Sequence, residues 1–165
     1  MNLEDVRQEI DRIDGQIKEL FLQRMQLADQ VCQIKKETGA PVYAPERERE
    51  VICMRSAGVD ASRVPFCRAF FQQLMGISRT CQYLEMEERN RTRIEIPEGE
   101  GSVELALCCK PADGRLAACL NAAALAGLSL DRVHMEGGRC QMRLSGDFST
   151  KLAKAAILQI IEETA

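Results

Sequence analysis

The sequence predicts an α+β protein in which an all-helical first half, residues 1–91, is followed by a mixed half, residues 92–165. Apolar residues recur every three or four positions through the first half, which is the periodicity of amphipathic helices. From about residue 92 the pattern changes to short apolar runs separated by glycine-containing turns, and such runs are typical of strands. A chain of 165 residues is long enough for two small domains, each with a modest core.

A long first helix is predicted from Leu3 to just before Gly39. Asn2 is a good N-cap, and Gly39 followed by Pro41 should end the helix. About 36 residues in one helix would span roughly 54 Å, and the rest of the first half is too short to cover it. A homodimer is therefore expected. The apolar repeat consists of Leu3, Val6, Ile10, Ile13, Ile17, Leu20, Leu27, Val31 and Ile34.

One position of this repeat, between Ile17 and Val31, is filled by Arg24. Helical spacing puts Arg24 and Lys35 on one stripe, where a buried cation needs an anionic partner. A polar residue that sets the register of a coiled coil, with a surface lysine beside it, is the alternative. Arg7 lies roughly 25 Å away along the axis, so it could reach such a pocket only on an antiparallel second copy.

The second helix is predicted from Pro45 to about Ala57, with Ala44 as a poor N-cap that forgoes about 1 kcal/mol. Glu46 and Glu48 are well placed in its first turn. A charge run such as ERERE is usually a solvated helix face. Within it, we expect only Arg47 and Glu48 to face a site.

The third helix is predicted from residue 62 or 65 to about residue 89. One edge of its apolar face carries Phe71, Met75, Ser78 and Gln82 at intervals of four, three and four. Ser78 and Gln82 should therefore point the same way as their apolar neighbours. Taken singly, each could also be an ordinary polar residue at the boundary of a helix interface.

Together these motifs resemble a known family. The opening LEDVRQEIDRIDGQIKELFLQRMQLADQVCQIKK, the loop TGAPVYAPERE and the late segment FFQQLMGISRTCQ are similar to the all-helical class of chorismate mutase. The resemblance covers residues 1 to about 90. It implies an intertwined dimer of three-helix chains that converts chorismate to prephenate, a rearrangement that needs no metal and no cofactor.

The resemblance also implies roles for individual residues. Arg24 and the partner's Arg7 would clamp the substrate carboxylates, as suits guanidinium groups. Lys35 and Gln82 would donate to the breaking ether oxygen, and Glu48 would accept from the ring hydroxyl. The implied catalytic residues are thus Arg24, Lys35, Glu48 and Gln82.

Ser78 and Arg47 would line the same pocket and support its ligands. One position departs from the family pattern. Where the family often has an aspartate that caps the second helix and contacts the substrate, this chain has Ala44. We expect that loss to weaken binding or turnover without abolishing it.

The second half predicts the element order β-α-β-β-α. The order and the DGRL turn (Asp113–Leu116) resemble an ACT domain, a ferredoxin-like regulatory module. The usual final strand is missing, or is replaced by the upstream RTRIEI. Such a module would be a phenylalanine or tyrosine sensor or a plain dimerisation domain. The predicted segments are 103–109, 111–127, 128–136, 139–146 and about 149–163.

The composition bounds the function further. Net charge is −3 with interleaved signs, so no nucleic-acid or membrane surface is expected. No apolar run approaches the roughly 20 residues of a membrane span and no leader is evident, so a cytoplasmic protein is expected. The eight cysteines contain no CxxC and His134 is the single histidine, so we expect reduced thiols and no metal site.

Two other functions fit the sequence. The first is an isochorismate-pyruvate lyase on the same helical scaffold, which would use similar arginine clamps. The second is a non-catalytic regulatory subunit that carries an amino-acid sensor, an idea that Ala44 supports best. The ether-oxygen and hydroxyl contacts implied by the resemblance favour the mutase.

Overall fold

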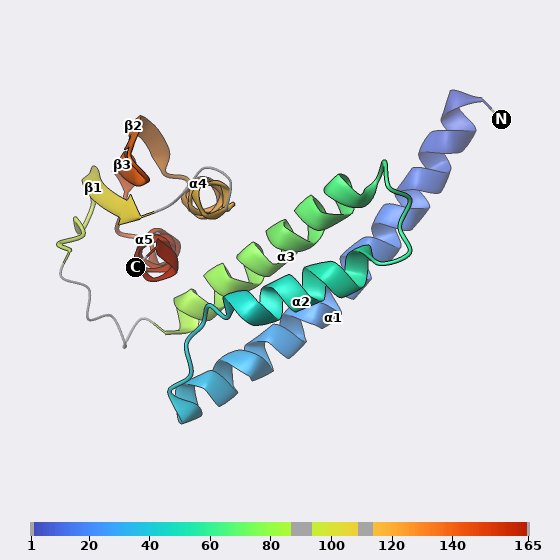
Figure 1. Cartoon of the computed structure of the whole chain (residues 1–165), viewed down its shortest axis with the longest axis horizontal. Helices are drawn as coiled ribbons and strands as arrows, with labels where there is room; N and C mark the ends of the chain where they lie inside the picture. The colour runs from blue at the N-terminus through green and yellow to red at the C-terminus, as the bar shows by residue number, and fades with distance from the viewer. Residues whose placement is uncertain (1, 87–93, 109–113, 165) are drawn as a thin grey trace. The chain divides into compact units, whose positions relative to one another are not determined.

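A computed structural model describes residues 2–86, 94–108 and 114–164 of the chain. The described elements divide into two compact units, Met1–Gly39 and Ala40–Ala165. The first unit is helix α1, and the second holds α2 and α3 together with the sheet and its helices (Figure 1). The predicted domain boundary between residues 91 and 92 lies outside the described residues.

Helix α1 runs unbroken over Leu3–Thr38, 36 residues, as the apolar repeat predicted. Asn2 caps it: its Oδ1 accepts from the Asp5 amide at 2.9 Å, and Asp5 Oδ2 accepts from the Asn2 amide at 2.9 Å. This reciprocal pair satisfies amide groups that have no partner inside the helix. Gly39 ends the helix at φ 76°, and its N–H donates to the Lys35 carbonyl at 3.0 Å.

The apolar repeat of α1 is largely exposed in the single chain. Leu3 is 66% exposed, Leu20 63% and Leu27 60%. The stripe continues through Val6, Ile10, Ile13, Ile17, Val31 and Ile34, each at least 38% exposed. A helix whose apolar stripe is left uncovered over this length is typical of an interface that needs a partner.

Helices α2 (Pro45–Ser56) and α3 (Val64–Glu85) begin the second unit. Ala44 is the N-cap of α2 and makes no side-chain cap, as predicted. Between the helices, Asp60 accepts from the Ser62 amide at 2.9 Å and from its hydroxyl at 2.6 Å, which shapes the turn. The predicted end of the third helix near residue 89 lies outside the described residues.

The rest of the second unit has the predicted order β-α-β-β-α. Its elements are β1 (Glu100–Cys108), α4 (Arg115–Leu125), β2 (Ser129–Glu136), β3 (Arg139–Asp147) and α5 (Lys151–Thr164). The strands form an antiparallel sheet in the order β1-β3-β2. Gly137 and Gly138, with φ 57° and 82°, make the tight turn between β2 and β3, because both positions need the left-handed conformation.

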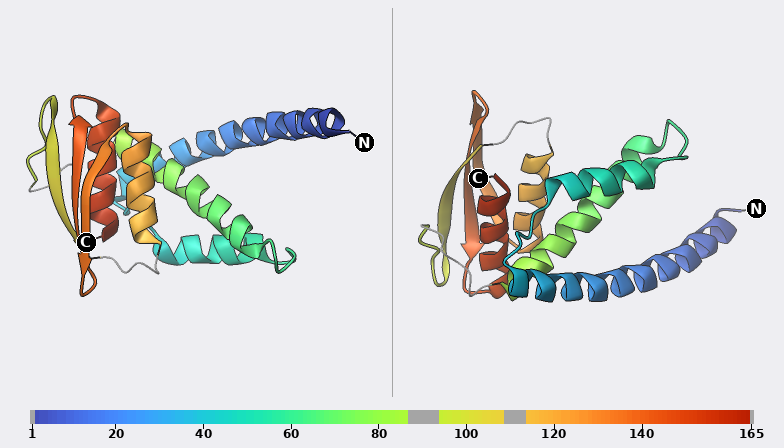
Figure 2. Two further views of the ribbon diagram at one scale, coloured as in Figure 1. Left: turned by 90° about the horizontal axis from the view of Figure 1, so that it is seen from above. Right: turned by 60° about the horizontal axis from the view of Figure 1, so that its bottom comes forward.

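Helices α4 and α5 cover one face of this sheet (Figure 2). The core between them is apolar: Leu105, Met142, Leu144, Phe148 and Ile157 are each at most 2% exposed. Ile94 and Ile96 pack against this core but form no strand. From Ile94 onward, the segment that was expected to replace a final strand therefore does not do so. The ferredoxin-like assignment of the C-terminal part stays a prediction.

Candidate functional site

The basic residues predicted for the site lie along α1. Arg24 and Lys35 are both half-buried, and eleven residues of helix separate them by about 16 Å. Arg7 is exposed, with its Nη1 3.9 Å from Oε2 of Glu4. An exposed pair at this distance is weak, so the Arg7 guanidinium can exchange its neighbour for a ligand at little cost.

The polar residues predicted on α3 are buried on one face of that helix. Ser78 is 4% exposed and Gln82 is 7% exposed, alongside Met75 at 6%. The Ser78 hydroxyl donates to the Leu74 carbonyl at 3.1 Å, and Gln82 Nε2 donates to the Ser78 carbonyl at 3.3 Å. The spacing of four residues thus puts both side chains on one stripe, as predicted.

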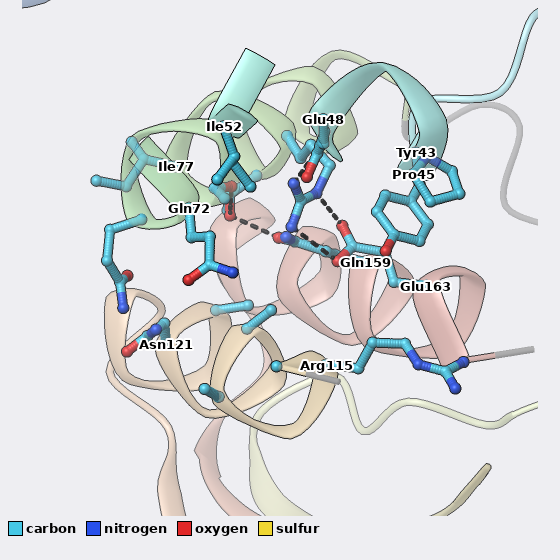
Figure 3. A pocket seen from close by; sticks show the side chains of 18 of the residues that line it. Tyr43, Pro45, Glu48, Ile52, Gln72, Ile77, Arg115, Asn121, Gln159 and Glu163 are labelled. Carbon is cyan, nitrogen blue, oxygen red and sulfur yellow. Dashed lines mark hydrogen bonds and ion pairs between the residues drawn. The ribbon is translucent and has the colours of Figure 1, made fainter. Parts of the chain in front are cut away.

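Glu48 takes part in a buried ion cluster that the sequence did not reveal. Arg79 of α3 donates from Nε to Glu163 Oε1 at 2.5 Å and from Nη2 to Glu163 Oε2 at 3.0 Å. Its Nη1 donates to Glu48 Oε1 (Figure 3). The Tyr43 ring lies 5.1 Å from the guanidinium carbon, which is within the range of a cation–π contact. Glu163 is on α5, so three helices meet at one arginine.

Burial and charge oppose each other in this cluster. Burial would lower the pKa of Arg79, but the carboxylates of Glu163 and Glu48 outweigh it and raise that pKa. Burial raises the pKa of Glu163, and the bonds from Arg79 offset this only in part. Arg79 and Glu163 are each 5% exposed. Removing either one would therefore leave the other as a buried charge with fewer partners, which is costly.

Arg47 lies on the exposed side of α2 in the single chain. Its Nη1 is 3.2 Å from Glu50 Oε2, and the Arg47 side chain is 65% exposed. Arg49 and Glu46 make a similar pair at 2.9 Å. The charge run is therefore mostly exposed, and Glu46 and Arg49 also line the pocket described next, whereas Arg47 does not. Only Glu48 of this run is drawn into a buried cluster.

A pocket of about 750 Å³ lies beside this cluster, between α2, α3, α4 and α5 (Figure 3). Amide side chains, among them Gln72, Asn121 and Gln159, line it together with apolar groups such as Ile52 and Ile77. Glu48 lines the pocket, whereas Ser78 and Gln82 do not. Helix α3 thus carries two polar faces, the predicted one and a second one turned toward α4 and α5.

Sequence reasoning missed Arg79 and Glu163, and it also missed the neighbouring pair Thr80 and Gln159. The Thr80 hydroxyl donates to Gln159 Oε1 at 2.5 Å, and both residues are buried. A signal was present, because Ser78, Arg79 and Thr80 are three consecutive polar residues in the middle of α3. A triplet of this kind cannot keep all its members on one face, which indicates a second contact surface.

The described residues contain no group of acidic, cysteine or histidine side chains that could hold a metal ion. Within the same part of the chain, every helix is too short or too polar to cross a membrane.

The chain was compared with known proteins. Residues 6–83 match the family described as chorismate mutase type II. Among curated proteins, the T-protein of Haemophilus influenzae is 39% identical over 67 residues, which is 38% of this chain and 18% of the relative. The bifunctional chorismate mutase/prephenate dehydratase of Aquifex aeolicus is 45% identical over 49 residues, 30% of this chain and 14% of the relative.

The chorismate mutase of Methanocaldococcus jannaschii is 41% identical over 49 residues, 30% of this chain and 50% of the relative. The chain thus matches at most half the length of these relatives. No solved structure matches it significantly. The matched segment contains every residue predicted for the site, from Arg7 to Gln82. Residues 6–83 are therefore a chorismate mutase type II domain.

Proposed function

We propose that the protein is a chorismate mutase, which converts chorismate to prephenate by a cofactor-free [3,3] rearrangement in phenylalanine and tyrosine biosynthesis. The observation that carries the proposal is the family match over residues 6–83, because that segment holds every residue predicted for the site. The relatives named for this activity support it further.

The protein forms no covalent bond with the substrate in this reaction. One carbon–oxygen bond breaks while one carbon–carbon bond forms in the same molecule, with no leaving group and no net proton transfer. The protein must hold a dianion in its compact conformer and stabilise the charge that builds on the ether oxygen. Cationic and amide donors in a water-poor site suit both tasks.

The half-buried cations of α1 suit both binding of the substrate carboxylates and stabilisation of the ether oxygen. Arg24 would bind one substrate carboxylate through paired N–H donors, and Lys35 would donate to the ether oxygen. Gln82 of α3, buried on its stripe, would donate to the same oxygen through its amide. Glu48 would accept from the ring hydroxyl, and Ser78 would line the pocket.

Arg47 remains a proposed lining residue. Its bond to Glu50 is exposed, and exposed pairs contribute about 0–1 kcal/mol. A substrate carboxylate could therefore replace Glu50 at little cost.

We further propose a homodimer in which the partner's Arg7 completes each site. The exposed apolar stripe of α1 supports this, because it offers a surface that a second α1 would cover. Arg7 lies about 25 Å along the axis from Arg24, so in an antiparallel pair it reaches toward the other chain's site.

Incubation with chorismate and, separately, with isochorismate tests the activity directly. Prephenate from chorismate supports the mutase, and salicylate plus pyruvate from isochorismate would identify the lyase. No product from either substrate would favour the non-catalytic regulatory subunit.

Variants test the assigned residues. Arg24→Ala and Gln82→Ala should each lower kcat/KM by about 100-fold or more, because each removes a donor to developing or fixed negative charge. Gln33→Ala, an exposed position on the same helix as Arg24, is the control and should change little. Unchanged prephenate formation in Arg24→Ala or Gln82→Ala would contradict the assignment.

For the C-terminal part we propose an ACT-like regulatory or dimerisation module. The β-α-β-β-α order and the central place of β3 in the sheet support it. If it senses an aromatic amino acid, millimolar phenylalanine or tyrosine should change prephenate formation, whereas alanine should not.

We also propose a cytoplasmic location, supported by the described cysteines, none of which forms a disulfide.

A further inference from the structure

Arg79 is the point where the last helix of the chain reaches the candidate catalytic carboxylate. Its Nε and Nη2 are both bonded to Glu163 of α5, while Nη1 is bonded to Glu48 of α2. All three nitrogens of the guanidinium are therefore engaged. A single side chain links a helix outside the chorismate mutase type II segment to a residue inside it.

The carboxylates of Glu163 and Glu48 contact the guanidinium of Arg79 in different ways. Glu163 grips the guanidinium with both oxygens and is 4% exposed in its side chain, so it fixes the plane of the group. Glu48 is bound through Oε1 and its side chain is 21% exposed. Of the three charged groups, Glu48 has the most access to solvent, as a group that meets a substrate requires.

The Tyr43 ring restricts the cluster further. The guanidinium carbon lies over this ring, 5.1 Å from its centroid, so the ring limits the space in which the guanidinium can move. Nη1 is thereby aimed in one direction, toward α2. Since a buried arginine with fewer partners is costly, the arrangement resists any rotamer that would release Glu48.

We propose that Arg79 and Glu163 are positioning residues for Glu48, so that the C-terminal helix α5 takes part in setting up the mutase site. The proposal rests on the proposed function above. Through its bond, Arg79 holds Oε1 of Glu48, and Oε2 is the oxygen that accepts the substrate hydroxyl. Loss of Glu163 lets the guanidinium rotate, and Glu48 then loses its fixed orientation even though α2 itself is unchanged.

The competing explanation is that the ion pair only holds α5 against α3. A neighbouring contact provides the control for it, because Thr80 also bonds to α5 through Gln159. Thr80→Val removes that bond and the bond from the same hydroxyl to the Gly76 carbonyl, keeps the side-chain shape and leaves the bonds of Arg79 to Glu163 and Glu48 in place. A purely structural contribution would make Glu163→Gln and Thr80→Val behave alike.

The test uses the full chain, with kcat and KM for chorismate measured below the unfolding temperature of every variant. Glu163→Gln is expected to lower kcat about tenfold with a smaller change in KM, since the amide can accept only one of the two bonds from Arg79 and carries no charge. Arg79→Lys should also be slow, because a lysine keeps the charge but cannot make the three-way contact. Thr80→Val should retain kcat. Full kcat in folded Glu163→Gln, or an equal loss in Thr80→Val, would overturn the proposal.

A second measurement does not depend on turnover. Urea unfolding of Glu48→Gln, Glu163→Gln and the double variant forms a double-mutant cycle. Coupling through the shared guanidinium predicts that the effects on unfolding free energy are not additive, while additive effects would contradict the link. If the wild-type chain forms no prephenate, the proposed function fails, and this cycle still decides whether Arg79 joins the two carboxylates.

Discussion

Ala44 is a single residue whose replacement should act on both stability and activity. It occupies the N-cap of α2 without a side-chain bond, four residues before Glu48. Ala44→Asp should raise the free energy of unfolding by about 1 kcal/mol. It should also raise kcat/KM if the carboxylate meets the substrate hydroxyl, as the family resemblance implies.

Ala44→Ser separates these two effects. Serine can cap the helix but brings no carboxylate, so it should stabilise the chain without improving turnover. Thermal denaturation and steady-state kinetics on both variants provide the measurement. An Ala44→Asp variant unchanged in both would show that neither the cap nor the contact is limiting.

The tyrosines give a prediction on pH. The chain has two tyrosines and no tryptophan, so absorbance at 295 nm follows the tyrosines alone. Burial raises the pKa of both Tyr43 and Tyr83. The folded protein therefore keeps these protons at pH values where the unfolded chain, with a pKa of about 10, has released them.

The sign follows from that difference. The contribution of Tyr43 and Tyr83 to the free energy of unfolding is present below the pKa of tyrosine in the unfolded chain. It is lost as the pH rises through their higher pKa values in the folded protein. Native protein at pH 10 should show less tyrosinate than the urea-unfolded chain, which should be close to half ionised. A native titration that overlays the unfolded one would contradict the burial of both rings.

Among the elements, α1 has the most open apolar surface. Ile17 is 45% exposed in the single chain, and we expect a second α1 to cover it. Ile17→Asp should therefore weaken the dimer, because it places an unpaired carboxylate in the interface. Sedimentation across a concentration series should show a shift toward monomer, with a lower and concentration-dependent Tm.

Gln8→Asp is the matched control on α1. It adds the same charge to the same helix on the side away from the apolar repeat, so the association should be unchanged. Equal effects of both substitutions would indicate that the charge, and not the stripe, is responsible. A monomeric wild-type chain at micromolar concentration would contradict the proposed dimer itself.

Within the second unit, α3 and α5 are joined by buried polar contacts, so its parts should lose stability together. Leu144 on β3 is fully buried in the sheet core. Leu144→Ala should cost about 3 kcal/mol, and hydrogen exchange should quicken in α3 as well as in β3. Val133→Ala, at a half-exposed site on β2, should change neither. Unchanged exchange in α3 would show that the helices and the sheet open separately.

At the scale of the whole molecule, local signals predicted the elements well. The repeat of α1, the cap at Asn2, the stop at Gly39 and the turn at Gly137 depend on neighbours in sequence, and each is confirmed. The stripe of Ser78 and Gln82 followed from helical spacing for the same reason. Such features need only periodicity and backbone preference.

The Arg79 cluster could not be predicted in the same way. Glu163 is 84 residues from Arg79 in sequence, and no periodicity relates positions on different helices. Only the packing of α5 on α3 brings them together. The polar triplet around Arg79 indicated a second contact surface, but it did not identify the partner.

The buried guanidinium also makes the family segment depend on a helix outside it. A buried arginine at position 79 is stable because it pairs with Glu163, which belongs to a helix beyond residue 83, the end of the family segment. Without that helix the guanidinium would lose its bidentate partner and the cover that α5 gives it. Relatives that lack the C-terminal helix should therefore have no need of an arginine where this chain has Arg79, and the arginine and the glutamate should be gained or lost together.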